Sequence, residues 1–159
     1  MRRTARQPTT GTDEAIAIRP ATLADVPGVV ALDEDVTGLL KTEYWRDMFG
    51  RYGTRRGESR FFLVAGNAGC IDGFIIGEVR AWEFGSPPSG WIFAVQVRAR
   101  LRVQGLGSRL FAAVCDCFRA AGVDRVRTMV ARDNTVMHAF FRSQAMMAGP
   151  FIELEMRLD

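Results

Sequence analysis

The stretch that decides the fold is "WIFAVQVRARLRVQGLGSRLF", residues 91–111. Its first seven residues are almost all apolar, which is typical of a strand in the middle of a sheet. Further along, apolar residues recur at helical spacing instead. This helical stripe consists of Leu106, Leu110, Ala113, Val114, Cys117 and Ala121. The change of period predicts a buried strand that leads into a helix through a turn containing Gly105 and Gly107.

That turn has the properties of an anion-binding site. The first turn of a helix carries free backbone N–H groups and the positive end of the helix dipole. Glycine lets a phosphate come close to the backbone because it has no Cβ. Ser108 adds a hydroxyl group, and positive charge comes from Arg98, Arg100, Arg102 and Arg109. The sequence therefore predicts that an anionic ligand binds where this helix begins.

Three other interpretations of the same turn compete with this one. A dinucleotide-binding turn needs a third glycine, and Leu110 stands at its place. A nucleotide P-loop needs a lysine followed by serine or threonine after its last glycine, and no lysine stands there. A helix start whose glycines serve only close packing stays open on this local pattern.

The rest of the chain divides into alternating strands and helices that the same patterns predict. Thr22 and Asp25 form a capping box at the start of the first helix. The predicted elements are a strand at 15–20, helices at 23–36 and 41–53, strands at 60–66, 71–84 and 91–97, a helix at 106–121, a strand at 125–131, a helix at 133–145 and a strand at 151–158. The order β-α-α-β-β-β-α-β-α-β predicts an α/β (α+β) domain with about six strands in a mixed sheet between helices.

Length and composition limit the classes of protein that this chain can be. Its 159 residues fit one domain at 15–159, with residues 1–14 as a disordered tail. Three cysteines favour a reducing compartment, and hence the cytoplasm. No apolar run is long enough to cross a membrane, and a net charge of +3 does not call for nucleic acid. Arginine supplies nearly all of the positive charge, since Lys41 is the only lysine.

Several motifs resemble one known family when they are taken in order. The loop Arg102-Val103-Gln104-Gly105-Leu106-Gly107 is similar to the pyrophosphate loop, Arg/Gln-x-x-Gly-x-Gly/Ala, of the GNAT (GCN5-related N-acetyltransferase) family, and it follows a strand that ends at Val97. Asn134 opens "NTVMHAFFRSQAM", which resembles a second segment of that family, and "AIRPATLADVPGVVAL" resembles its first strand and helix. The resemblance covers residues 15–159.

The resemblance implies an enzyme that uses acetyl-CoA and no metal. It transfers the acetyl group to a primary amine, which attacks the thioester directly in a ternary complex; the acceptor is unknown. The pyrophosphate would lie on the N–H groups of residues 103–108, and the pantetheine arm along 95–97. The implied CoA-binding residues are Val95, Gln96, Val97, Arg102, Val103, Gln104, Gly105, Leu106, Gly107, Ser108 and Asn134.

The residues that move protons depart from the family pattern. The tyrosine that protonates the thiolate in the family is replaced by Phe141, and a glutamate that some members use is replaced by Met129. We expect Glu78, in the middle of an apolar strand, to relay the proton through ordered water. An ion pair with Arg80, on the same face of the strand, is an equally good explanation of Glu78.

Two further side chains are candidates for proton transfer. Glu83 is the second candidate for the general base. His138 falls at a different helical angle from Phe141, which favours an ordinary surface histidine.

Two larger alternatives remain open. The family usually has two strands with a sizeable loop after the last helix, and this chain has room for less after Ala145. We therefore expect an acceptor site that is either open or completed by a second subunit in a homodimer. Because Phe141 cannot donate a proton, the chain is alternatively a CoA-binding module or regulator without catalysis, or a nucleotide-binding regulator that uses the same glycine turn.

Overall fold

The computed structural model describes residues 16–54 and 57–158 and contains one five-stranded sheet in the order β1-β2-β3-β4-β5. The strands are β1 (Ile18–Pro20), β2 (Arg60–Asn67), β3 (Cys70–Arg80), β4 (Ser89–Val97) and β5 (Val126–Arg127). The helices are α1 (Val26–Thr37), α2 (Thr42–Tyr52), α3 (Leu106–Ala120) and α4 (Thr135–Ser143). Three short 3₁₀ segments accompany them: η1 (Leu23–Asp25), η2 (Glu83–Gly85) and η3 (Ala99–Gln104).

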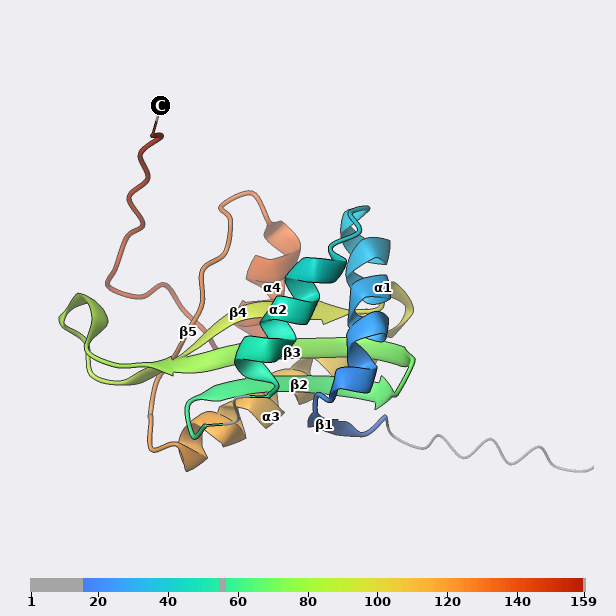
Figure 1. The fold of residues 1–159 in the computed structure, drawn as a ribbon. Coiled ribbons are helices and arrows are strands. Elements are labelled where there is room, and N and C mark those ends of the chain that lie inside the picture. The colour runs from blue at the N-terminus through green and yellow to red at the C-terminus, as the bar shows by residue number, and fades with distance from the viewer. Residues whose placement is uncertain (1–15, 55–56, 159) are drawn as a thin grey trace, which may run out of the picture.

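The sheet lies between helices, as the sequence predicts. Strands β1 to β4 pair antiparallel and β5 joins β4 in parallel. Figure 1 shows α1 and α2 in front of the sheet, with α3 on its other face and α4 near β4 and β5. The predicted α/β (α+β) class is therefore confirmed, with five strands instead of six.

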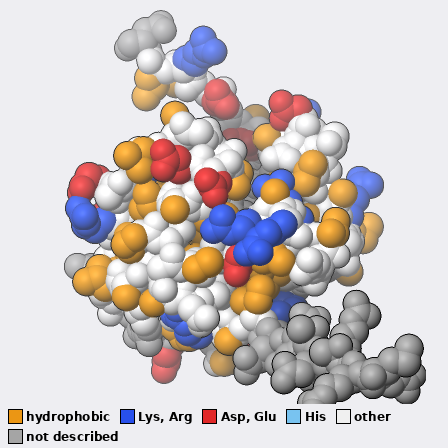
Figure 2. Space-filling view, turned by 90° about the vertical axis from the view of Figure 1, so that its right-hand side faces the viewer, with side chains coloured by type: hydrophobic (Ala, Val, Ile, Leu, Met, Phe, Trp, Pro, Cys, Tyr) orange, Lys and Arg blue, Asp and Glu red, His pale blue; other side chains and the backbone are white. Residues whose placement is uncertain are grey.

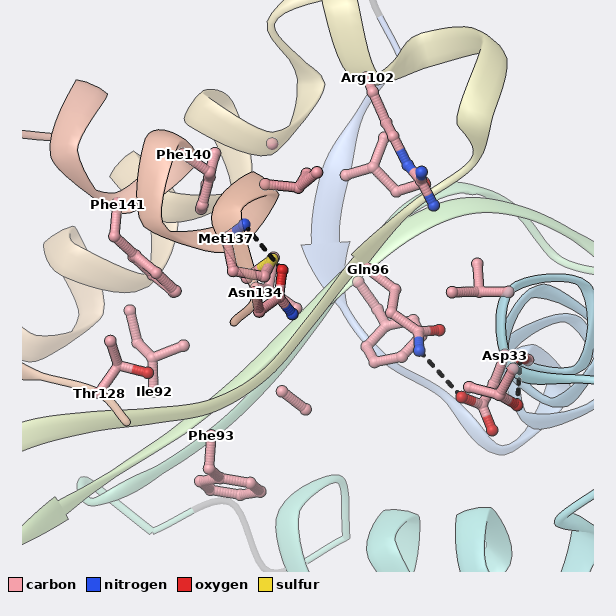
Figure 3. A pocket seen from close by; sticks show the side chains of 18 of the residues that line it. Asp33, Ile92, Phe93, Gln96, Arg102, Thr128, Asn134, Met137, Phe140 and Phe141 are labelled. Atoms are coloured by element: carbon pink, nitrogen blue, oxygen red, sulfur yellow. Dashed lines mark hydrogen bonds between the residues drawn. The ribbon is translucent and has the colours of Figure 1, made fainter. Parts of the chain in front are cut away.

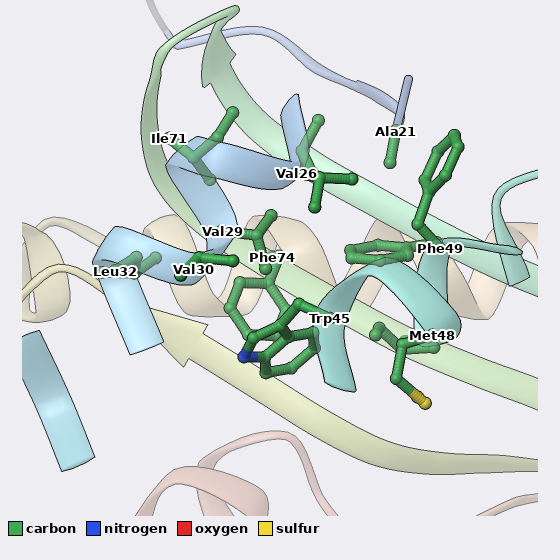
Figure 4. Packing of buried hydrophobic residues seen from close by; sticks show 13 residues of the cluster. Ala21, Val26, Val29, Val30, Leu32, Trp45, Met48, Phe49, Ile71 and Phe74 are labelled. Carbon is green, nitrogen blue, oxygen red and sulfur yellow. The ribbon is translucent and has the colours of Figure 1, made fainter. Parts of the chain in front are cut away.

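The core between α1, α2 and the sheet is built around aromatic rings (Figure 4). The Trp45 ring stands edge-on to that of Phe74, with 4.9 Å between the ring centroids. Phe49 and Leu32 are buried in the same cluster. Replacing a buried aromatic residue of this kind by alanine costs about 3–5 kcal/mol, so this cluster fixes α1 and α2 on the sheet.

Helix α3 packs tightly on the other face because β3 carries glycines beneath it. A Cβ atom at Gly73 would lie 2.9 Å from Leu110 Cδ1, and one at Gly77 would lie 2.7 Å from Phe118 Cζ. Both of these α3 side chains are fully buried. The close contact holds the beginning of α3 beside the end of β4.

Strand β4 separates from β5 soon after their pairing begins. The parallel ladder joins Gly90 to Val126 and Trp91 to Arg127 only. On its other side, β4 pairs with β3 up to Val97, with a bulge that places Phe93 between the paired residues Ile92 and Ala94. Among the residues that the structure describes, no strand therefore pairs with the outer edge of β4 from Ile92 onward.

Three predicted elements differ from the observed ones. Residues 151–158 are not a strand; they are exposed and run away from the body of the molecule (Figure 1). The strand predicted at 125–131 is reduced to two residues, and β3 ends at Arg80 because Trp82 and Phe84 adopt positive φ angles of 65° and 54°. Alternating apolar residues indicate which face of a strand is buried, but they do not supply the partner strand that pairing needs.

The predicted capping box at the start of the first helix is confirmed. The Thr22 N–H and Oγ1 both donate to Asp25 Oδ2 at 2.8 Å. The predicted tail at 1–14 lies outside the described residues. Within the part of the chain that the structure describes, no helix is long and apolar enough to cross a membrane.

Candidate functional site

A cavity of about 920 Å³ extends across β4 (Figure 3). Residues of β4 from Ile92 to Val97 form its floor. We call one side the α2 half; it is lined by Asp33, Val36, Thr37, Lys41, Tyr44 and Trp45, with Phe74, Phe93 and Ala94 from the sheet. We call the other side the α4 half; it is lined by Arg102, Gly107, Ser108, Thr128, Met129, Asn134, Val136, Met137, Phe140, Phe141 and Ser143.

The separation of β4 from β5 opens this cavity. Val95, Gln96 and Val97 all line it, on the part of β4 that β5 does not reach. A strand edge without a neighbour presents backbone N–H and C=O groups. An extended ligand with amide groups can pair with such an edge as an added strand would.

The beginning of α3 meets the same cavity. Gly105 adopts a φ of 77°, in the left-handed region, and its carbonyl accepts the first helical hydrogen bond from the Arg109 N–H. The N–H groups of residues 106–108 precede that bond, so they are the free donors of the first turn. Gly107 and Ser108 line the cavity, and the Ser108 Oγ accepts a hydrogen bond from Gln144 Nε2.

The turn needs glycine at positions 105 and 107 for two different structural reasons. At Gly105 the positive φ is the reason, since L side chains rarely adopt it. At Gly107 the reason is space, because a Cβ there would lie 3.0 Å from the Phe140 ring. Close packing of α3 against α4, which the sequence left open, therefore applies to Gly107, and any side chain at this position would disturb α4.

The predicted CoA-binding residues do not all reach the cavity. Six of them line it: Val95, Gln96, Val97, Arg102, Gly107 and Ser108. Asn134 lines it as well and begins α4, with its Oδ1 accepting a hydrogen bond from the Met137 N–H at 3.1 Å. Val103, Gln104, Gly105 and Leu106 do not line it: Val103 is 94% exposed and Leu106 is buried in the core.

The arginines that follow β4 differ in what they bind. Figure 2 looks at the end of the molecule where β4 ends and shows Lys and Arg side chains gathered there beside carboxylates. Arg98 and Arg100 both contact Asp72 Oδ1, at 3.3 and 3.0 Å. Arg102 donates from Nε to the Val97 carbonyl and lines the cavity. Arg102 is therefore the arginine placed to meet an anion there.

Sequence reasoning missed Asp33, a buried carboxylate in the α2 half. Its Oδ1 accepts a hydrogen bond from Gln96 Nε2 at 2.9 Å; its Oδ2 accepts one from Trp45 Nε1 at 2.7 Å and lies 2.8 Å from Lys41 Nζ. Burial alone would raise the pKa of Asp33, but hydrogen bonds from these three side chains lower it. The available signal was an acidic residue next to Leu32 on the apolar face of a predicted helix.

Comparison with known proteins supports one family. The model of the acetyltransferase (GNAT) family matches residues 29–146, which is most of the chain. The chain belongs to the GNAT family. A search of curated proteins finds no match.

Solved structures share the fold of this GNAT protein. Aminoglycoside N-acetyltransferase AAC(6')-Iy in complex with CoA has a TM-score of 0.77 at 14% identity, covering 89% of this chain and 94% of the other. Aminoglycoside 6'-N-acetyltransferase AAC(6')-IG from Acinetobacter haemolyticus has a TM-score of 0.73 at 16% identity, and the match covers 91% of this chain and 100% of the other. A transcriptional regulator from Bacillus halodurans C-125 has a TM-score of 0.74 at 18% identity, and the match covers 90% of this chain and 99% of the other.

In this GNAT protein, Glu78 is not among the residues that line the cavity. Its Oε1 is 2.9 Å from Arg80 Nε, so the ion pair that the sequence offers as the alternative is present. The Tyr52 hydroxyl donates to Glu78 Oε2 at 3.2 Å. Burial, and then the Glu78 charge, raise the pKa of Tyr52. The Tyr52 ring lies 5.0 Å from that of Phe93, which does line the cavity.

The other proton-transfer candidates lie elsewhere. Glu83 is about half exposed, 3.9 Å from Arg80, and His138 Nε2 lies 3.1 Å from the Ala131 carbonyl; neither lines the cavity. Phe141 lines the α4 half, buried against Phe140, with Thr128 beside it in Figure 3. In the described part of the chain, no group of three or more His, Cys, Asp or Glu residues is placed to hold a metal.

Proposed function

We propose that this protein is an acetyl-CoA-dependent N-acetyltransferase that acetylates a primary amine by direct attack in a ternary complex. One observation carries the proposal: the free edge of β4 and the first turn of α3 line the same cavity. A thioester on a long amide-containing arm with a pyrophosphate at its other end matches these two features. Family membership supports the same reaction.

The α4 half is proposed to hold the donor. The pyrophosphate would accept hydrogen bonds from the first N–H groups of α3, with Arg102 and the Ser108 hydroxyl adding charge and a further donor. The pantetheine amides would pair with β4 along 95–97. Asn134 would contact the arm or order it. Val103 and Gln104 are proposed to contribute through their backbone N–H groups, since their side chains do not line the cavity.

The α2 half is proposed to admit the amine. The neutral amine nitrogen forms a bond to the thioester carbon, the C–S bond breaks, and the amine gives up a proton. A backbone N–H of β4 near Val97 would stabilise the developing negative charge on the carbonyl oxygen. Because Phe141 has no proton to give, protonation of the thiolate is assigned to ordered water.

Glu78 remains our proposed general base, which would receive the proton of the amine through a relay. Its Oε2 accepts a hydrogen bond from Tyr52, whose ring packs against Phe93 of the cavity lining. Because Phe93 cannot carry a proton, the transfer between the amine and Glu78 would run through ordered water. Its ion pair with Arg80 is the structural alternative, and Glu78→Gln separates the two roles.

A second candidate function is a CoA-binding module or regulator that does not catalyse transfer. Phe141 at the position of the family's tyrosine favours it, and one protein with this fold is described as a transcriptional regulator. A nucleotide-binding regulator is the third candidate, because the glycine turn is common to several phosphate sites.

A thiol-release assay tests the proposal. The full chain is mixed with acetyl-CoA and a panel of primary amines, and free CoA thiol is followed with a thiol reagent, with the N-acetyl product verified by mass spectrometry. Amine-dependent release supports the enzyme. CoA binding without release from any amine supports the module, and competition by ATP or NAD supports the nucleotide-binding regulator.

Two properties of the whole protein are also proposed. A cytoplasmic location fits its free cysteines, Cys70, Cys115 and Cys117. A homodimer fits the exposed apolar side chains after α4, where Ile152, Leu154, Met156 and Leu158 are 78–87% exposed. Large exposed apolar patches mark interaction surfaces in proteins.

A further inference from the structure

The α2 half of the cavity is walled mainly by apolar and aromatic side chains. They are Val36, Tyr44, Trp45, Phe74, Phe93 and Ala94. Tyr44 and Phe93 are 49% and 40% exposed, so a molecule that enters this half meets their rings. Aromatic faces and edges favour an aromatic or aliphatic partner over a strongly hydrated one.

The charges in the cavity do not favour a polycation. Among the described residues that line it, the charged ones are Asp33, Lys41 and Arg102. Asp33 and Lys41 are paired at 2.8 Å, with 1% and 34% of their side chains exposed. The carboxylate is therefore covered by the protein's own ammonium group, and what this half presents to an incoming amine is Lys41.

The ammonium group of Lys41 also favours the reactive form of an acceptor that has a single amine. A cation near an amine favours the neutral form, which is the nucleophile. A molecule with several ammonium groups gains no attraction from the neutralised Asp33–Lys41 pair, because the described lining offers no free carboxylate to its further charges.

We propose that the acceptor is a primary amine with one amino group on an aromatic or apolar body, and that Lys41 sets this preference by neutralising Asp33. The inference rests on the proposed acetyltransferase function and narrows its substrate class. It separates this protein from the aminoglycoside acetyltransferases that share its fold, because aminoglycosides carry several amino groups.

The test compares three amines as acceptors with acetyl-CoA and the full chain. They are 2-phenylethylamine, the diamine cadaverine and the aminoglycoside kanamycin, and kcat/KM is measured by thiol release. Wild-type protein should favour phenylethylamine over cadaverine by about tenfold or more, which equals about 1.4 kcal/mol. A wild-type preference for cadaverine or kanamycin would overturn the inference.

Three variants test the role of Lys41. Lys41→Ala exposes the Asp33 carboxylate, so the ratio of phenylethylamine to cadaverine should fall about tenfold. The double variant Asp33→Asn/Lys41→Ala removes both charges and should restore the ratio. Arg46→Ala is the matched control, because Arg46 is an exposed cation on α2 that does not line the cavity. An unchanged ratio in folded Lys41→Ala protein would contradict the role of Lys41.

The design also separates this inference from the proposed function. Removing Lys41 leaves a buried carboxylate without its counter-ion, which is destabilising, so folding is verified by circular dichroism. If Lys41→Ala does not fold, Lys41→Gln takes its place and is compared with Asp33→Asn/Lys41→Ala. Lys41→Gln should lower the ratio of phenylethylamine to cadaverine, and the double variant should preserve it. Release with cadaverine alone would support an acetyltransferase and overturn the inference. If no amine is turned over, the proposed function fails, and calorimetric titration of the same amines into the acetyl-CoA complex decides the preference.

Discussion

Asp25 ties the first strand to the start of α1 at the scale of single residues. Both of its oxygens accept hydrogen bonds from Arg19 at 2.7 Å, and one also accepts from Thr22. The hydrogen bonds from Arg19 are the main reason that the pKa of Asp25 falls from 3.8 to about 2. A lowered pKa means that this pairing stabilises the fold above pH 4 and that the stabilisation is lost as the pH falls towards 2.

Asp25→Asn should therefore flatten the acid end of the stability profile. Between pH 6 and pH 2, the wild-type free energy of unfolding should fall by about 2 kcal/mol more than that of the variant, measured by urea unfolding. Asp116→Asn is the control, since Asp116 and Arg119 form an exposed pair worth at most about 1 kcal/mol. Equal pH dependence in wild type and Asp25→Asn would contradict the account.

Glu78→Gln separates a proton relay from an ion pair. A relay predicts that kcat/KM falls by about tenfold or more and that its dependence on pH changes. An ion pair with Arg80 predicts a loss of stability of about 1 kcal/mol with an unchanged pH profile. An unchanged kcat/KM over the whole pH range would rule out the relay.

Single residues were predictable where a motif fixed them. The Thr22–Asp25 capping box follows from spacing along one helix. Asp33 could not be found in this way, because its partners Trp45 and Gln96 come from other elements and are brought together only by folding. Glu78 was identified from its position in an apolar strand, but its distance from the cavity depends on the arrangement of the whole sheet.

Helix α3 offers a test at the scale of one element. Ser108→Glu places a carboxylate where the pyrophosphate is proposed to lie, so acetyl-CoA should bind at least about a hundredfold more weakly by calorimetry. The same charge at a helix N-terminus is favourable by about 0.3–1 kcal/mol, so thermal stability should be preserved. Gly107→Glu is a poorer choice, because a Cβ at this position meets Phe140.

Ala112→Glu is the matched control for that experiment. Ala112 lies one turn further along α3, is exposed and does not line the cavity. Its acetyl-CoA affinity should stay within about threefold of the wild type, since exposed charges at this distance are screened by salt. If Ser108→Glu bound acetyl-CoA as tightly as Ala112→Glu, the pyrophosphate would have to lie elsewhere.

Elements with strong internal patterns were predictable, and elements that depend on a partner were not. The four helices and the strands β1 to β4 lie where their periodicities indicate, within a few residues. By contrast, 151–158 alternates just as clearly and 125–131 also has a strand-like composition, yet of these residues only Val126 and Arg127 pair. Strand pairing depends on two segments that lie side by side, whereas the sequence pattern describes only one segment.

The segment after α4 matters at the scale of the whole molecule. Removing residues 152–158 takes away side chains that are almost fully exposed, so the melting temperature of the monomer should change by less than about 2 °C. If these side chains make a homodimer, sedimentation should show a dimer for the full chain and a monomer for the truncated one. The same sedimentation for both would contradict the proposed role of this segment.

The central claim concerns the whole cavity: that the free edge of β4 and the first turn of α3 together bind acetyl-CoA. The most direct measurement is a calorimetric titration of acetyl-CoA into the full chain, repeated in the presence of CoA, ATP or NAD. The account predicts saturable one-to-one binding that CoA abolishes and that ATP and NAD leave unchanged. Absence of saturable binding, or equal displacement by ATP or NAD, would contradict it.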